Sequence, residues 1–214
     1  MPIFDNTTRP RDAVSTALAW AIGEVEDGID AGRIDGTHYL RSKREFSAHS
    51  GSATLTIYFS GSKWNRTGYG IWLHSGMAIR DSELGRWRRA NDAGADGSDD
   101  FLDHFQLNTR DTVVWQPFGA APNPFADHDL ADLPAVIRRN LSEALDTYSD
   151  PLTAVNMVPV NHLTALNMAA FAEWAFARDR PDDGEKVLRI APQRRPVLAQ
   201  YVSPIARILG IAET

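Results

Sequence analysis

The hydrophobic pattern in the first half of the chain predicts a helix followed by an antiparallel pair of strands. Between residues 12 and 29, apolar side chains recur at intervals of three and four, which places them on one stripe of a helix. In "SATLTIYF" apolar and polar residues alternate, so Leu55, Ile57 and Phe59 share one face of a strand. We expect that face to pack against the helix stripe.

The segment "TGYGIWLHSGM" predicts the next strand, paired with the first through the polar loop "GSKWNR". Trp72 and His74 alternate on it and should point to one face. The loop carries Lys63, Trp64 and Arg66. We expect Trp64 to fold back over the edge of the sheet, and a ligand-binding or partner-binding role for the loop is the alternative.

The rest of the chain is mostly helical in pattern, in "LADLPAVIRRNLSEALDTY", "NHLTALNMAAFAEWAFARDR" and shorter C-terminal pieces. "DSELGRWRRA" predicts a short helix after an Asp cap, with Arg86, Arg88 and Arg89 on a solvated face. The predicted fold class is α+β: an N-terminal helix packed on an antiparallel sheet, followed by a mostly helical C-terminal layer. We expect a single domain, 1–214, with a helix-plus-sheet half at 12–118 and a helical half at 130–214.

Composition narrows the function classes. The 214 residues include no cysteine, which excludes disulfides and thiolate metal sites and fits a cytoplasmic protein. No apolar run reaches the length of a membrane helix, and the N-terminus has no secretory signal pattern. The net charge of −6 offers no overall basic excess, so nucleic acid is not the expected partner.

Acidic residues are concentrated between Asp99 and Asp150, where ten of them face three arginines. Such a surface suits a basic protein partner, because complementary charge speeds encounter. Asp127, Asp129 and Asp132 are the candidate contact residues on this acidic face.

The sequence shows no catalytic or metal-binding signature. The six histidines have no metal-ligand spacing, and no phosphate-binding loop or nucleophile elbow is present. "DAGADGSDDFLD" has Gly97 where a calcium loop needs its glycine, but Gly94 supplies no ligand at the third position. We therefore expect a solvated acidic loop there, no metal site and no cofactor.

The stretch from Leu55 to Met77 resembles a family of uncharacterised bacterial proteins, the one catalogued as domain of unknown function four-three-zero-four. The similarity covers roughly residues 12 to 90, and Ser60 and the pair His74-Ser75 depart from the family pattern. It implies an α+β fold and no particular activity. The residues that carry it are Phe59, Ser62, Lys63, Trp64, Tyr69, Ile71, Leu73 and Gly76.

Two function hypotheses follow from the sequence. The first is a non-catalytic cytoplasmic bacterial protein-binding module, of the immunity or antitoxin type, that uses the acidic face. The alternative is a small-ligand-binding protein or enzyme with a pocket lined by Trp64, Trp72 and His74. The oligomeric state is not predicted.

Overall fold

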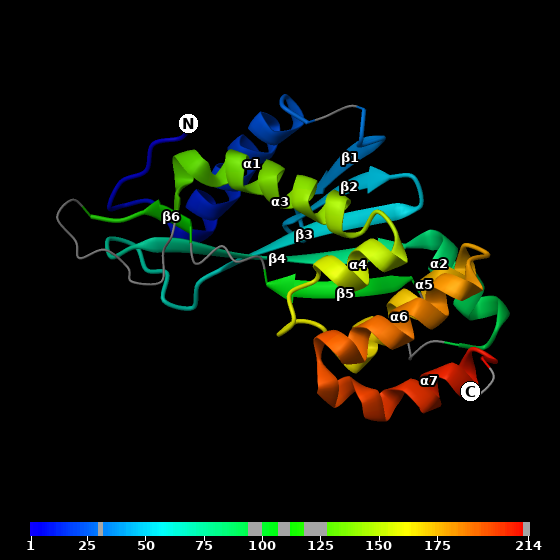
Figure 1. The fold of residues 1–214 in the computed structure, drawn as a ribbon. Coiled ribbons are helices and arrows are strands. Elements are labelled where there is room, and N and C mark those ends of the chain that lie inside the picture. Colours follow the sequence, from blue (N-terminus) through cyan, green and yellow to red (C-terminus); the bar gives the residue numbers. More distant parts are fainter. Residues whose placement is uncertain (30–31, 94–99, 107–111, 118–127, 212–214) are drawn as a thin grey trace. The chain divides into compact units, whose positions relative to one another are not determined.

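The chain folds into two compact units. The computed structural model describes residues 1–29, 32–93, 100–106, 112–117 and 128–211 (Figure 1). The first unit comprises Met1–Gly51, Leu55–Met77 and His104–Ser142, and the second comprises Ser52–Thr54, Ala78–Asp103 and Glu143–Thr214. The predicted α+β class is confirmed, since an N-terminal helix precedes a mostly antiparallel sheet and the C-terminal half is helical.

The described residues form a seven-stranded sheet in the order β1-β2-β3-β4-β6-β7, and β5 also pairs with β4. The β4–β6 pair is antiparallel and the short β6–β7 pair is parallel. Strands β3, β4 and β5 each contribute residues to both units. The strands are β1 (Gly36–Leu40), β2 (Glu45–Ser50), β3 (Ala53–Gly61), β4 (Ile71–Asp81), β5 (Phe101–Gln106), β6 (Thr112–Trp115) and β7 (His128–Asp129).

The core of the first unit lies between the sheet and two helices. Figure 1 shows α1 (Pro10–Glu26) and α3 (Leu133–Thr147) on one side of β1, β2 and β3. The Arg138 guanidinium donates to the Glu24 carbonyl at 2.7 Å and so ties α3 to α1. The buried residues of this core include Val14, Leu18, Ile22 and Val25 of α1, Phe46 of β2, Leu55, Ile57 and Phe59 of β3, and Ile71 and Leu73 of β4.

The opposite face of the same strands is polar and partly open. Trp72 is half-buried and His74 is exposed, as the alternation along β4 predicts. The Tyr58 ring lies so close to Gly76 that a Cβ there would be 2.0 Å from the Tyr58 hydroxyl oxygen. Glycine is therefore required at position 76 for this ring to pack across the strand pair.

The second unit is built around α5 (Ala165–Ala177), whose Trp174 and Phe171 are fully buried. The predicted Asp cap of α2 is confirmed: the Asp81 carboxylate accepts the backbone N–H groups of Glu83 and Leu84, both at 2.9 Å. The other elements of this unit are α2 (Ser82–Ala90), α4 (Pro151–Met157), α6 (Pro181–Arg194), η2 (Pro196–Tyr201) and α7 (Val202–Ile208), while η1 (Leu130–Asp132) belongs to the first unit and directly precedes α3.

The expectation that Arg88 lies on a solvated helix face is wrong. Arg88 is only 7% exposed, and its Nε donates to Glu173 of α5 at 2.7 Å. Its Nη1 also donates to the Phe101 carbonyl at 3.0 Å. A buried guanidinium is tolerated only when its donors are paired, so this pair joins α2 to α5 and to the start of β5.

A second buried polar group in this unit is Asp103 of β5. Its carboxylate accepts a hydrogen bond from the Tyr148 hydroxyl and one of 2.6 Å from Asn167 Nδ2. Burial, reinforced by the Asp103 charge, raises the pKa of Tyr148 far above its ordinary value. Tyr148 therefore stays a hydrogen-bond donor, and the network holds β5 against α5.

The sequence pattern did not predict β5, α4 or the two-residue β7. β5 follows directly after the predicted acidic loop, most of which lies outside the described residues. α4 has a readable start signal, since Asp150 accepts the Leu152 and Thr153 N–H groups and Pro151 occupies the first turn.

Within the described residues, no helix has both the length and the apolar character needed to cross a membrane.

Replacing Phe59 with alanine should lower the free energy of unfolding by about 3–5 kcal/mol, because it leaves a cavity beside fully buried neighbours. Phe59 is 4% exposed, whereas the adjacent Ser60 is exposed and provides the control Ser60→Ala. Urea unfolding followed by circular dichroism measures both. Equal stability of the two variants would contradict the placement of Phe59 in the core.

Glu173→Leu should lower the free energy of unfolding by about 3–5 kcal/mol, because it leaves the Arg88 charge buried without its partner. The double variant Arg88→Met/Glu173→Leu should lose less than the sum of the two single variants. A double-mutant cycle by urea unfolding measures this coupling, and strictly additive losses would show that the pair does not act as a unit.

Candidate anion-binding site

The turn between β1 and β2 places two arginines beside α1. The Lys43 N–H donates to the Leu40 carbonyl at 3.1 Å, and the Arg44 N–H donates to the Arg41 carbonyl at 3.3 Å. The Arg44 carbonyl accepts the Phe59 N–H of β3 at 3.0 Å. The turn is thus tied to the core strand next to it, and the positions of Arg41 and Arg44 are set by backbone hydrogen bonds.

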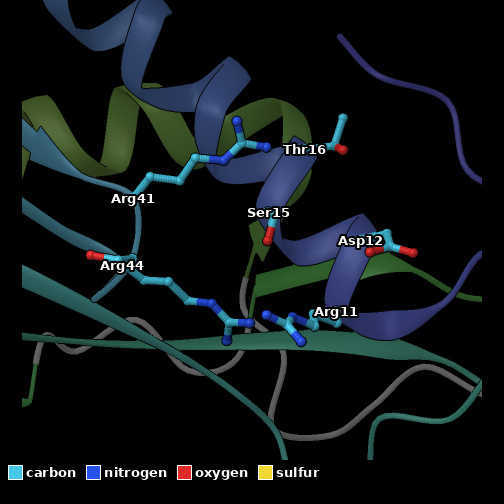
Figure 2. Close-up of a pocket in the computed structure, with 7 residues that line it drawn as sticks. Arg11, Asp12, Ser15, Thr16, Arg41 and Arg44 are labelled. Atoms are coloured by element: carbon cyan, nitrogen blue, oxygen red, sulfur yellow. The ribbon is translucent and has the colours of Figure 1, made fainter.

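These two arginines and the first turns of α1 enclose a polar hollow of about 390 Å³ (Figure 2). The α1 residues contribute from one face of the helix because positions four apart lie one turn above each other. Figure 2 shows the guanidinium ends of Arg11 and Arg44 pointing toward one another near Ser15. The lining residues are Arg11, Asp12, Ser15, Thr16, Arg41, Ser42 and Arg44.

The hollow carries a net positive charge. Three guanidinium groups and one carboxylate, that of Asp12, line it. Across the described part of the chain, Arg11, Arg41 and Arg44 have no carboxylate within ion-pair distance. Figure 2 shows Asp12 directed away from the guanidinium groups. Among the described residues, Asp12 is thus the one carboxylate that lines the hollow, against three guanidinium groups.

Tyr39 of β1 responds to the same charges. It pairs across the ladder with Phe46 and so lies on the α1 side of the sheet. Burial raises the pKa of the Tyr39 hydroxyl, and the Arg41 and Arg44 charges oppose that rise. The Tyr39 hydroxyl oxygen is buried and finds no hydrogen-bond partner among the described residues. The Arg41 and Arg44 charges thus act on a neighbouring hydroxyl as well as on the hollow.

Arg44 occupies a backbone conformation that ordinarily selects glycine. Its φ is +57°, in the left-handed region where a side chain costs about 1–2 kcal/mol. A strained residue retained in a turn suggests that its side chain has a use. Arginine presents five N–H donors in a planar fork, which matches the oxygens of a phosphate or carboxylate.

The side chains that line the hollow are mainly hydrogen-bond donors. Arginine stays protonated in proteins and does not serve as a general base. Ser15 and Thr16 add hydroxyl donors, but neither has a histidine among the lining residues to activate it. Across the described ranges, no group of three or more histidine, aspartate or glutamate side chains could hold a metal ion.

The sequence-predicted loop residues lie together on the surface, outside this hollow. Trp64 is 61% exposed, so the expectation that it folds back over the sheet edge is wrong. Instead, the Asn65 side chain occupies that edge, accepting the Trp72 N–H and donating to the Trp72 carbonyl, both at 2.8 Å. Lys63 and Arg66 flank Trp64 and are exposed.

The other predicted site residues do not converge. The Trp72 ring packs against Gly70, where a Cβ would be 2.4 Å from it, and His74 is exposed further along β4. Asp129 and Asp132 are exposed at η1, where the Asp132 carboxylate accepts the Asp129 N–H at 3.4 Å. Asp127 lies outside the described residues. The acidic-face hypothesis stays a prediction.

None of the three arginines of the hollow is among the site residues predicted from the sequence. "RSKR", residues 41–44, is a dense basic turn between two strands and could have indicated it. Arg11 has no comparable signal, because only the packing of α1 on the sheet brings it opposite this turn.

Arg44→Gly should raise the free energy of unfolding by about 1 kcal/mol, because glycine adopts a positive φ without steric cost. Arg44→Ala keeps the strained backbone and should not stabilise, which makes it the matched control. Thermal and urea unfolding measure both variants. A destabilised glycine variant would mean that Arg44 supports the fold through its side chain.

Comparison of the chain with family models, with curated proteins and with solved structures finds no match. The assignment of the site therefore rests on its geometry.

Proposed function

We propose that this protein is a non-catalytic binding protein whose first unit holds an anionic group, a phosphate or a carboxylate, in the hollow between α1 and the β1–β2 turn. The observation that carries the proposal is the presence of Arg11, Arg41 and Arg44 around one hollow without carboxylate partners among the described residues. An anion entering the hollow would supply the missing counter-charge.

The construction of the hollow supports this proposal. Charge-assisted hydrogen bonds from arginine to an anion are about twice as strong as neutral ones. Holding three positive charges near each other costs free energy, and Arg44 adds backbone strain. Both costs persist without a ligand and would be offset when an anion binds.

Pyrophosphate should raise the melting temperature of the protein, because a ligand that binds only the folded state stabilises it by mass action. At about one hundred times the dissociation constant the gain is about 2.7 kcal/mol. Differential scanning fluorimetry over a pyrophosphate series, at low and at high sodium chloride, measures the effect. The shift should shrink at high salt, where the field of exposed charges is screened.

Arg41→Ala and Arg44→Ala should each abolish most of this shift. Lys43→Ala is the matched control, since Lys43 is an exposed cation of the same turn that does not line the hollow. If all three variants reduce the pyrophosphate-induced rise in melting temperature equally, binding depends only on the positive charge of the turn, and the proposed pocket is wrong. No shift in the unmodified protein would also refute the proposal.

A further inference from the structure

The loop between β3 and β4 is held in one conformation by its own hydrogen bonds. The Asn65 N–H donates to the Ser62 carbonyl at 3.1 Å, and the Asn65 side chain binds both backbone groups of Trp72. Further along, Arg66 and Gly70 exchange hydrogen bonds of 3.1 and 3.2 Å. The side chains on this loop are therefore presented on a well-supported backbone.

Two large aromatic side chains of this loop face solvent. Trp64 is 61% exposed and Tyr69 is 67% exposed. The Lys63 ammonium lies 5.1 Å from the centre of the Trp64 ring, and Arg66 is the other cation of the loop. Exposed aromatic rings with flanking cations are the combination that stacks on flat, negatively charged ligands.

The loop adjoins the positive hollow. A Cβ placed on Gly61 would lie 4.0 Å from Arg44 Nη1 and 3.1 Å from the Asn65 side-chain nitrogen. One placed on Gly68 would lie 3.4 Å from the Asn6 carbonyl, in the segment that leads into α1. The Arg44 head group thus lies close to Gly61, where the loop begins, and Asn6 lies close to Gly68, so the hollow and the loop are neighbours in the first unit.

This surface is basic although the protein is acidic. The segments 5–12, 41–45 and 61–70 hold seven basic and three acidic residues, against a net charge of −6 for the chain. The prediction against nucleic acid rests on that total charge, whereas binding depends on the local field. These three segments carry a net positive charge, whereas the whole chain carries a net negative one.

We infer that this surface binds a nucleotide, with its phosphate in the arginine hollow and its base stacked on Trp64 or Tyr69. The inference rests on the proposed anion binding and names the ligand class. A phosphate concentrates its charge in one tetrahedral group, which several guanidinium forks can bind together, and a base supplies the flat partner for an exposed ring. An acidic peptide would satisfy the arginines and leave the rings unexplained.

The ligand is either a free nucleotide or a nucleotide unit of a single strand, and competition separates the two. Fluorescence anisotropy with a labelled oligothymidylate of about 12 nucleotides reports binding. The competitors are adenosine monophosphate, an abasic oligomer of the same length, and polyglutamate. Displacement by adenosine monophosphate at matched phosphate concentration identifies the free nucleotide, and its failure to compete identifies the single strand.

Trp64→Ala or Tyr69→Ala, whichever removes the stacking ring, should weaken oligothymidylate binding about tenfold, in line with the loss of one stacked base. Both variants should leave the pyrophosphate-induced rise in melting temperature unchanged. Tyr201→Ala removes an exposed tyrosine of the second unit and should change neither measurement. Because Trp64 is exposed, the variant should fold normally, and its own melting curve verifies this.

Two results would overturn the inference while sparing the proposed function. In the first, polyglutamate or the abasic oligomer displaces labelled oligothymidylate as well as an intact oligomer does. In the second, Trp64→Ala and Tyr69→Ala both bind oligothymidylate with unchanged affinity. A protein that binds neither oligothymidylate nor pyrophosphate refutes both. Oligothymidylate binding that Arg44→Ala leaves intact places the ligand away from the hollow and overturns the inference as stated.

Discussion

Burial of one sheet face in the first unit is the interaction on which its other features depend. The alternation in β3 directs Leu55, Ile57 and Phe59 into the core, where large apolar side chains contribute about 1.5–3 kcal/mol each. The same packing sets α1 across the strands, so the first turns of α1 come to lie beside the β1–β2 turn. The polar hollow is therefore a consequence of how the core is closed.

The β1–β2 turn connects that core to the candidate site. Arg44 uses its carbonyl to bind β3 and its side chain to line the hollow, and it does both from a left-handed backbone. Glycine at position 44 could make the same carbonyl hydrogen bond to β3 without the backbone strain, because it has no Cβ. Under the proposed anion binding, the arginine side chain would contribute to the ligand what its backbone strain costs the fold.

Charged side chains have different surroundings in the two units. In the second unit, Arg88 and Asp103 are enclosed and each has hydrogen-bonding partners, so their charges serve the packing of α2, β5 and α5. In the first unit, Arg41 and Arg44 line an open hollow without such partners among the described residues. The same side-chain chemistry is structural in one place and available for a ligand in the other, and the neighbours decide which.

The sequence by itself determined the elements that local periodicity encodes. The α1 stripe, the alternation of β3 and β4 and the Asp81 cap are properties of near neighbours in the chain. What only the tertiary structure decided is which distant residues meet: Arg11 with Arg44, Arg88 with Glu173, and Gly61 with the Arg44 head group. Trp64 shows the limit most clearly: it is exposed while the polar Asn65 side chain binds the backbone of Trp72 at the sheet edge, an arrangement that hydrophobicity alone does not reveal.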